Sequence, residues 1–290
     1  MNIEFSKMHV CGNDFIIIDW NKPVIENIQL SKLAVRLCNR HTGIGADELI
    51  LLSVSTSADI RVNIFNPNGT EAPICGNALL SIGHYISRKT SGKQINVSLE
   101  TRSGIRNVHL DEEYFLIVSM GKPFFSHPKY LRTLPLLGLT DVHLVYSGTQ
   151  HAIIFVDELS FLQVDVIGAY VEHNIIENTT TNVMFVQQET STRLKLRSWE
   201  RGGNGETMAC GSGACAAAYV TMSSSINISG KFEIVCAGGI IEVIIDSDRN
   251  TFLKARSNHV FDGSLEVESF LLEFKPLLQL DYPKSERLFK

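Results

Sequence analysis

The sequence contains no uninterrupted apolar stretch near the roughly 20 residues that a membrane-spanning helix requires, so we expect no membrane partner. It also has no long basic run, and its formal net charge is −5 at pH 7, so we expect no nucleic acid partner either. Residues 1–7 lack the basic and then apolar pattern of a signal peptide. Together these absences predict a cytoplasmic protein.

Cysteine patterns typical of metal sites are missing as well. The chain has no Cys-x-x-Cys pair and no Cys/His cluster with zinc spacing, so we expect no metal site. Its six cysteines are Cys11, Cys38, Cys75, Cys210, Cys215 and Cys236. In the cytoplasm we expect these thiols to be reduced.

The composition is otherwise that of an ordinary folded enzyme. The 290 residues are 44% hydrophobic and 20% charged, both close to the averages of globular domains. This length predicts one large domain or two domains of medium size, with enough residues for a buried core.

Two short stretches of the chain are similar to one another. Residues 75–77 (Cys-Gly-Asn) and residues 210–212 (Cys-Gly-Ser) each precede a run of small or apolar residues compatible with a helix. At the start of a helix, free N–H groups and the positive end of the dipole lower the pKa of a thiol and hold a carboxylate. The glycine lets an anion approach the backbone without a Cβ in the way. Two such elements predict two thiols, Cys75 and Cys210, that face one small acid from opposite sides.

The elements expected from hydrophobic periodicity and turn residues occur twice in the same order. The first half comprises expected strands at 3–7, 16–19, 49–54, 60–65, 95–99, 105–110 and 115–119 and helices at 30–39 and 75–89. The second comprises expected strands at 142–146, 152–156, 182–187, 194–199, 231–236, 240–245 and 251–255 and helices at 162–171 and from 210 onward. This duplication predicts an α+β protein of two similar lobes whose equivalent helix starts face a shared cleft.

The prolines and aromatic residues of the stretch 121–135 interrupt this pattern and mark the expected boundary between the lobes. We expect residues 1–120 to form the N-terminal lobe, with residues 265–290 completing it, and residues 121–264 to form the C-terminal lobe. Residues 9–15 are short, polar and glycine-bearing, and they are expected to form a turn that carries functional groups.

Several blocks of the sequence resemble the diaminopimelate epimerase family, and they occur in the family's order. They are MHVCGNDF at 8–15, RHTGIGAD at 40–47, NPNGTEA at 66–72 followed by CGN at 75–77, TNV at 181–183, and ERG at 200–202 followed by ACGSGAC at 209–215. The resemblance implies two pseudo-symmetric lobes, each a β-barrel-like sheet around a central helix, with the active site in the cleft between them. It also implies a mechanism without a cofactor, a small-molecule amino-acid substrate and a homodimer.

By this resemblance, Cys75 and Cys210 are the catalytic acid and base. The expected substrate-binding residues are Gly76, Asn77, Gly211 and Ser212 at the paired helix starts, and Asn13, Asn66, Thr149, Asn182, Glu200 and Arg201 elsewhere in the cleft. Two thiols suit the inversion of an α-carbon, because one removes a proton from one face and the other adds a proton to the opposite face. With ordinary pKa values of about 8.5, a thiol and a thiolate can exchange these tasks in either direction.

The chain departs from the family's usual pattern in the part of the cleft that holds the distal end of diaminopimelate. Thr149 stands where the family usually has asparagine, and Pro67 stands where aspartate is usual. Ala78 and Glu48 each replace a usual glycine, and the loop before Cys210 is one residue longer. The proton-transfer residues are retained, whereas the distal pocket is partly changed.

The remaining cysteines and two histidines have structural interpretations. Cys38, Cys215 and Cys236 are expected to pack in the core as small apolar residues. His9 and His151 are expected either to orient loops near the site or to contact the substrate.

Three functions remain open from the sequence. The first is an epimerase that converts L,L- to meso-diaminopimelate for lysine and cell-wall precursor synthesis. The second is a racemase of a different amino acid on the same scaffold. The third is a non-catalytic amino-acid binder, against which two reactive thiols argue. We favour the first, because the retained polar residues suit a substrate whose distal end is also zwitterionic.

Overall fold

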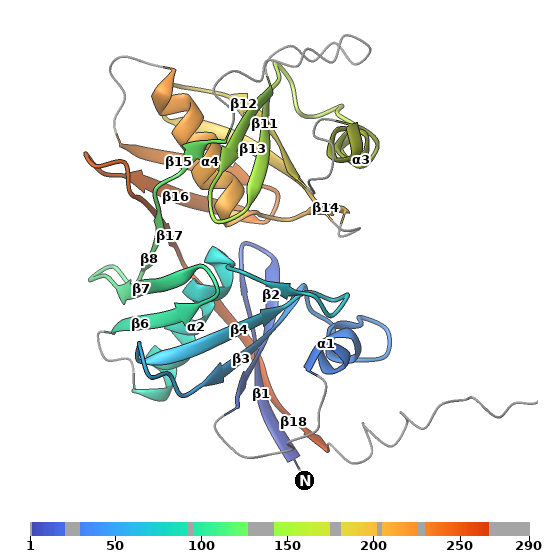
Figure 1. The fold of residues 1–290 in the computed structure, drawn as a ribbon, viewed down its shortest axis with the longest axis vertical. Coiled ribbons are helices and arrows are strands. Elements are labelled where there is room, and N and C mark those ends of the chain that lie inside the picture. The colour runs from blue at the N-terminus through green and yellow to red at the C-terminus, as the bar shows by residue number, and fades with distance from the viewer. Residues whose placement is uncertain are drawn as a thin grey trace, which may run out of the picture.

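The chain folds into two lobes of the same construction, each a curled sheet around one helix (Figure 1). The computed structural model describes residues 2–20, 30–91, 95–126, 142–174, 181–201, 205–224 and 230–266. Within these residues, four helices and eighteen strands form an α+β fold, and all the strands join one hydrogen-bonded sheet. The predicted fold class is confirmed.

The first lobe contains the elements up to β8. They are β1 (Asn2–Val10), β2 (Asn13–Asp19), α1 (Leu30–Cys38), β3 (Glu48–Ser53), β4 (Ile60–Phe65), β5 (Glu71–Ala72), α2 (Gly76–Lys89), β6 (Asn96–Thr101), β7 (Gly104–Leu110) and β8 (Leu116–Gly121). The second lobe contains the elements from β9 to β17. They are β9 (Phe124–Phe125), β10 (Val142–Tyr146), β11 (Gln150–Phe155), α3 (Val164–Asn174), β12 (Asn182–Gln188), β13 (Arg193–Glu200), β14 (Gly205–Thr207), α4 (Gly211–Ser223), β15 (Lys231–Cys236), β16 (Gly239–Ile245) and β17 (Thr251–Ala255).

The two lobes share one pattern of strand pairing. In the first lobe β1 and β2 pair antiparallel, β2 runs parallel to β3, and β4 runs parallel to β6. In the second lobe β10 and β11 pair antiparallel, β11 runs parallel to β12, and β13 runs parallel to β15. Phe15 pairs with Glu48 across β2 and β3, and His151 pairs with Asn182 across β11 and β12. Glu48 and Asn182, each the first residue of its strand, therefore hold equivalent positions.

The last described strand pairs with the first lobe. β18 (Asn258–Glu266) follows the second lobe in the chain and pairs with β1, whereas β9 pairs with β10 within the second lobe. β8 and β17 pair antiparallel and join the two lobes directly. Of the residues predicted to complete the first lobe, 265–266 end β18, and 267–290 lie outside the described residues.

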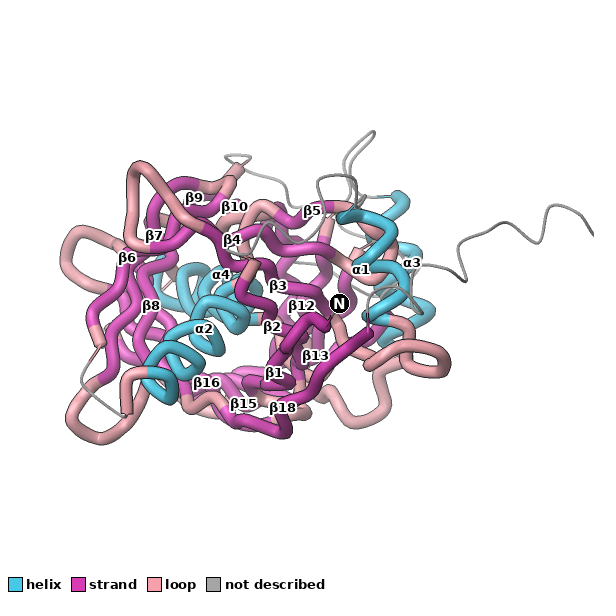
Figure 2. The backbone as a smooth tube through the Cα atoms, turned by 90° about the horizontal axis from the view of Figure 1, so that it is seen from below, coloured by secondary structure: helices cyan, strands magenta, loops and turns pink. Residues whose placement is uncertain are grey.

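Helices α2 and α4 lie inside the curled sheets, and α1 and α3 lie outside them (Figure 2). Residues 214–218 of α4 are alanines and one cysteine, all fully buried, and their small side chains let the surrounding strands approach closely. In α2, Leu79, Leu80 and Ile82 are fully buried as well. Because burial of each such side chain stabilises the fold by about 1.5–3 kcal/mol, the core holds both helix starts in place.

The first hairpin is tighter than the sequence predicts. The expected turn over residues 9–15 is reduced to Cys11 and Gly12, because β1 ends at Val10 and β2 begins at Asn13. Cys11 and Gly12 have φ angles of 48° and 81°, and positive values at both central residues are typical of a type I′ turn. This turn places Asn13 at the first position of β2, beside the start of α2.

Four strands were not predicted from the sequence: the two-residue strands β5 and β9, and the longer β14 and β18. β14 lies in the loop before Cys210 and pairs with β13, and residues 202–204 of that loop lie outside the described residues. β18 carries mainly exposed side chains, so it lacks the apolar alternation by which strands are recognised.

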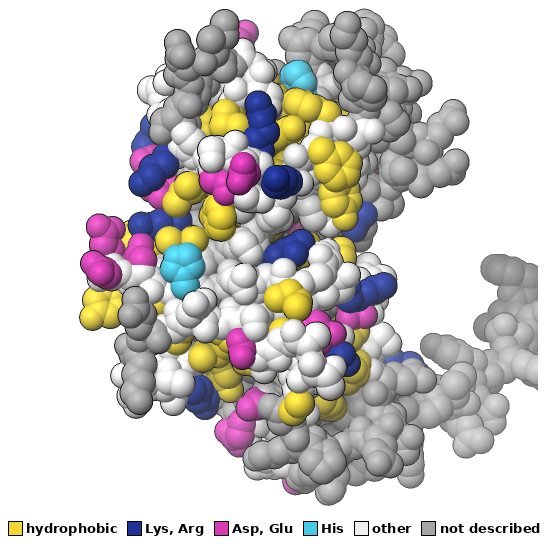
Figure 3. Space-filling model, turned by 60° about the vertical axis from the view of Figure 1, so that its left-hand side comes forward, with side chains coloured by type: hydrophobic (Ala, Val, Ile, Leu, Met, Phe, Trp, Pro, Cys, Tyr) yellow, Lys and Arg dark blue, Asp and Glu magenta, His cyan; other side chains and the backbone are white. Residues whose placement is uncertain are grey.

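The surface carries charges of both signs. On the face shown in Figure 3, the described lysine and arginine side chains are interspersed with acidic ones, so this face carries no extended patch of one sign. Within the described residues, no helix combines the length and the apolar character needed to cross a membrane.

Candidate active site

A cavity of about 550 Å³ lies between the two lobes. The first lobe contributes Gly12, Asn13, Cys38, Arg40, Ala46, Asp47, Glu48, Asn66, Pro67, Ala72, Pro73, Ile74, Cys75 and Gly76 to its wall. The second lobe contributes Thr149, Asn182, Glu200, Arg201, Glu206, Thr207, Met208, Cys210, Gly211 and Ser212. The predicted site residues are therefore brought together at one cavity, except Asn77.

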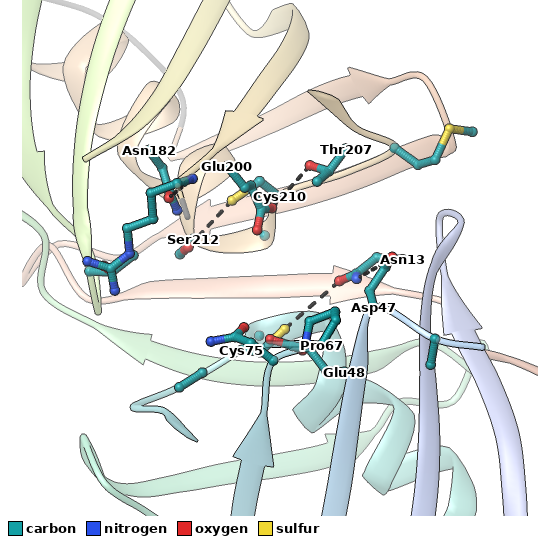
Figure 4. Close-up of a pocket in the computed structure, with 18 of the residues that line it drawn as sticks. Asn13, Asp47, Glu48, Pro67, Cys75, Asn182, Glu200, Thr207, Cys210 and Ser212 are labelled. Carbon is teal, nitrogen blue, oxygen red and sulfur yellow. Dashed lines mark hydrogen bonds between the residues drawn. The ribbon is translucent and has the colours of Figure 1, made fainter. Parts of the chain in front are cut away.

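The two predicted catalytic cysteines occupy equivalent positions at the starts of the inner helices. Cys75 is the N-cap of α2, with φ −141° and ψ 114°, and Cys210 is the N-cap of α4, with φ −122° and ψ 105°. Such extended backbone is typical of N-cap residues. Figure 4 shows the two thiols on opposite walls of the cavity, one from each lobe.

Backbone N–H groups of both helix starts are available to the cavity. The first helical hydrogen bonds run from Leu79 N–H to Cys75 O at 3.0 Å and from Ala214 N–H to Cys210 O at 2.9 Å. The N–H groups of the preceding residues have no partner within their helices. With the positive ends of two helix dipoles beside them, these donors suit a carboxylate.

The glycine after each cysteine is required by packing. A Cβ at Gly76 would overlap Cδ1 of Leu253, and a Cβ at Gly211 would lie 2.8 Å from the same atom and 3.0 Å from Asn77 Oδ1. The missing side chains thus let the two helix starts pack closely around Leu253. The predicted role, room for an anion, does not account for these contacts.

Both thiols have raised pKa values. Burial raises the pKa of Cys75 well above its ordinary value, and the Glu48 carboxylate raises it further. Burial also raises the pKa of Cys210, with Glu200 as the second cause. N–H groups of the first helical turn lower both values, as the sequence predicts, but burial and the carboxylates outweigh them. The predicted net lowering is therefore wrong, and both thiols are protonated at neutral pH in this structure.

Asn13 connects Cys75 to a charged network. The Cys75 thiol donates to Asn13 Oδ1 at 3.9 Å, and Asn77 Nδ2 donates to the same oxygen at 3.1 Å. Asn13 Nδ2 in turn donates to Asp47 Oδ2 at 2.9 Å, and Arg40 donates to Asp47 Oδ1 at 2.7 Å. Asp47 thereby fixes the orientation of the Asn13 amide. The Asn77 side chain is buried behind Asn13, so only its backbone can serve the predicted carboxylate site.

Glu48 was recognised in the sequence only as a departure from a usual glycine. The structure places it at the first position of β3, on the cavity wall beside Cys75. Burial is the main cause that raises the pKa of Glu48, to about 8. No sequence signal shows this proximity, because it depends on how β3 and α2 pack together.

On the opposite wall, Cys210 lies near Ser212 and Glu200. The Cys210 sulfur is 3.7 Å from Ser212 Oγ, and His151 Nε2 lies 3.1 Å from the same oxygen. His151 is fully buried, and burial lowers its pKa to about 4, so the ring is neutral at pH 7. Thr207 Oγ1 donates to Glu200 Oε1 at 3.1 Å, and burial raises the pKa of Glu200. His151 therefore orients Ser212 and does not line the cavity.

The other predicted binding residues line the cavity at its second-lobe end and at the β4–β5 turn. Asn182 Oδ1 accepts the backbone N–H of Arg201 at 3.1 Å, and Asn66 Nδ2 donates to Thr70 Oγ1 at 2.9 Å. Thr149 lies on the same wall as Asn182. These side chains provide both hydrogen-bond donors and hydrogen-bond acceptors around the cavity.

The cysteines expected to be structural are buried. Cys215 is fully buried in α4, and Cys236 is buried at the end of β15. Cys38 is buried in α1 and also contributes to the cavity wall. His9 accepts the Gly12 N–H through Nδ1 at 3.3 Å, which stabilises the first turn.

The sequence matches a known family over most of its length. The model of the diaminopimelate epimerase family matches residues 5–125 and 143–260. The diaminopimelate epimerase of Pelotomaculum thermopropionicum is 37% identical over 276 residues, which cover 90% of this chain and 98% of the relative. That of Brachyspira hyodysenteriae is 32% identical over 286 residues, which cover 92% of this chain and 100% of the relative.

Solved structures of low sequence identity share the fold. A hydroxyproline epimerase from Agrobacterium vitis aligns with a TM-score of 0.70 at 13% identity, covering 91% of this chain and 92% of that one. A PhzF-family phenazine biosynthesis protein from Bacillus anthracis aligns with a TM-score of 0.66 at 16% identity, covering 92% and 99%. The two-lobed architecture therefore recurs in proteins that carry different functional names.

Proposed function

The chain belongs to the diaminopimelate epimerase family, and from this premise we propose that it converts L,L- to meso-diaminopimelate with two thiols. It is an isomerase that inverts one α-carbon of its substrate. The proposed reaction supplies precursors for lysine and cell-wall synthesis.

The placement of the two thiols carries the proposal. Cys75 and Cys210 start helices of different lobes and line one cavity. A carbon held between them presents one face to each sulfur. One thiolate removes the α-proton, and the other thiol delivers a proton to the opposite face. A single base would return the proton to the face from which it came.

The helix starts stabilise the charge that develops during the reaction. Removal of the α-proton leaves a carbanion whose extra charge resides largely on the adjacent carboxylate. Backbone N–H groups at Gly76, Gly211 and Ser212, on the cavity wall, are fixed donors for this group. Because the donors are held by the buried helices α2 and α4, they need no reorganisation during proton transfer.

The second head group of diaminopimelate is held by further polar residues of the cavity wall. Arg201 suits its carboxylate, and Glu200 suits its ammonium group. Asn182 holds the Arg201 backbone through the 3.1 Å hydrogen bond, and Asn66 and Thr149 line the same space.

A racemase of a different amino acid is the second candidate. The observation that favours it is Thr149 on the cavity wall, where the family usually has an asparagine for the distal head group. One lost hydrogen bond to a charged group costs about 1.5–3 kcal/mol, or roughly ten- to a hundredfold in affinity. A water molecule can take the missing place, so we favour diaminopimelate.

A direct comparison of substrates tests the proposal. We expect kcat/KM for L,L-diaminopimelate to exceed that for L-glutamate, L-histidine and L-lysine by at least about 10²-fold, because these lack the second zwitterionic centre. A higher kcat/KM for any of these amino acids would assign the second candidate. The cytoplasmic location, the homodimer, and the lack of nucleic acid and membrane partners stay predictions.

A further inference from the structure

Glu48 has an unusual position for a carboxyl group. It lines the cavity beside the Cys75 thiol, within hydrogen-bonding reach of it (Figure 4). Its Oε2 atom is fully buried and has no hydrogen-bond partner among the described residues. Burying a carboxyl oxygen without a hydrogen-bond partner costs free energy, so its presence beside a reactive thiol indicates a function.

The symmetry of the lobes gives a second, independent observation. Glu48 begins β3, and Asn182 begins the equivalent strand β12. Asn66 follows the end of β4, and Glu200 ends the equivalent strand β13. Each lobe therefore places one glutamate and one asparagine around its cysteine. In the first lobe the glutamate begins the earlier strand and the asparagine follows the later one, whereas in the second lobe the asparagine begins the earlier strand and the glutamate ends the later one. Since Glu200 lies beside Cys210, Glu48 completes a matching thiol–carboxyl pair at Cys75.

We propose that Glu48 is the proton partner of Cys75, a positioning residue that takes the thiol proton and returns it during the reaction. This inference rests on the proposed function. In the step, the Cys75 S–H bond breaks, its electron pair stays on sulfur, and an O–H bond forms on the Glu48 carboxylate. The thiolate then accepts the substrate α-proton, so that the Cα–H bond breaks and a new S–H bond forms. After this step the pair holds one proton more and the Cys210 thiol, which protonates the opposite face, holds one fewer; exchange with water restores both. In the reverse direction Glu48 takes its proton back from water first, the Cys75 S–H bond breaks as the proton passes to the substrate carbon, and the Glu48 O–H proton then returns to sulfur.

The charged groups around Glu48 suit this exchange. Those that affect its titration are the thiol of Cys75 and the carboxylates of Glu200 and Asp47. Arg40 and Arg201 line the same cavity, but neither is a cause of the Glu48 pKa shift. Burial and the two carboxylates raise the pKa of Glu48, and the thiol lowers it, giving about 8. Without a fixed cationic partner, the carboxyl group can both accept and release a proton near neutral pH.

Single-thiol variants test the assignment on each face separately. In Cys210→Ala, exchange of the substrate α-proton with deuterium oxide depends on Cys75. Adding Glu48→Gln should slow this exchange about 10²-fold, the usual contribution of a proton-transfer group. In Cys75→Ala, exchange depends on Cys210, and Glu48→Gln should change it less than about twofold. An equal loss in both backgrounds would show a general structural role, and no loss in either would refute the inference.

The pH profile of epimerisation gives a measurement that does not depend on the single-thiol variants. With Glu48, kcat/KM should rise with a pKa near 8, because the first proton leaves the Glu48–Cys75 pair there. In Glu48→Gln the Cys75 thiol is the one group of this pair that can still ionise, and burial raises its pKa. The rising limb of kcat/KM should therefore move to higher pH by about one unit or more. Glu48→Asp keeps a carboxyl group and should restore the limb near its original position. An unmoved limb in Glu48→Gln would overturn the inference.

The exposed residue Glu112 provides a matched control, because Glu112→Gln removes the same charge away from the cavity and should leave the profile unchanged. The failure of this inference differs from that of the proposed function. If the unmodified protein does not epimerise diaminopimelate, the proposed function fails. If the protein does epimerise diaminopimelate, but Glu48→Gln changes neither the exchange rate nor the rising limb of the pH profile, only the proposed role of Glu48 fails.

Discussion

The pKa values of Cys75 and Cys210 are set by opposing effects of their surroundings. Helix N–H groups favour the thiolate, whereas burial and neighbouring carboxylates favour the thiol, and the second set prevails. The sequence shows the first influence, since it is local to the Cys-Gly motif. It does not show the second, which depends on residues brought together by folding.

Thr149→Asn tests which amino acid the cavity is shaped for. The asparagine amide offers both a donor and an acceptor, so we expect KM for L,L-diaminopimelate to fall about tenfold with little change in kcat. Thr149→Val keeps the shape of threonine without its hydroxyl group and should raise KM instead. Steady-state kinetics of both variants measure the effect. A rise in KM for Thr149→Asn would mean that Thr149 does not face the distal head group.

At the scale of elements, the two inner helices are positioned by their first residues. Gly76 and Gly211 let α2 and α4 approach the same buried atom, Leu253 Cδ1. Cysteine at the N-cap and glycine at the next position are therefore required for different reasons, one chemical and one steric. The repeated Cys-Gly motif predicted both helix starts correctly because both requirements are local.

Gly76→Ala tests this packing. The added methyl group meets Leu253 and Met120, so we expect a loss of about 1–3 kcal/mol in the free energy of unfolding, measured by urea denaturation. Leu253→Val removes the atom that the methyl group would overlap. In that background the cost of Gly76→Ala should be smaller, and the difference measures the contact. Equal costs in both backgrounds would contradict the packing argument.

One strand and one contact between residues could not be predicted from the sequence. β18 is held to β1 by main-chain hydrogen bonds, while most of its side chains face solvent, so its sequence gives no strand pattern. Glu48 begins a strand that was predicted, yet its contact with Cys75 joins residues from different elements. By contrast, β4, β15 and β17 have the predicted bounds, because their apolar residues alternate.

At the scale of the whole molecule, the duplicated order of elements predicted two similar lobes, and the structure confirms the predicted fold class. What the duplication does not show is how the lobes join. The pairings of β8 with β17 and of β1 with β18 connect distant parts of the chain, and no local pattern specifies them.

The acid stability of the molecule depends on Asp14, which links β1, β2 and the loop after α1. Burial alone would raise its pKa, but hydrogen bonds from Arg40 and Lys7 lower it to about 2. Since this value is below the ordinary 3.8, the carboxylate contributes stability above about pH 4 that is lost as the pH falls toward 2. Asp14→Asn should therefore cost about 1–3 kcal/mol at pH 7 and progressively less below pH 4.

Thermal unfolding between pH 7 and pH 3 measures this difference. Asp157→Asn removes the same charge at an exposed position and is the control. A constant difference between Asp14→Asn and the unmodified protein across this range would contradict the assigned pKa shift.

In the proposed mechanism, two thiols on opposite walls of one cavity invert an α-carbon of diaminopimelate. Incubation of the protein with L,L-diaminopimelate in deuterium oxide, followed by proton NMR and chiral separation, tests it most directly. We expect the meso isomer to accumulate with deuterium at the inverted carbon, and Cys75→Ala and Cys210→Ala each to abolish its formation. Formation of the meso isomer at an unchanged rate in either variant, or no deuteration by the unmodified protein, would contradict it.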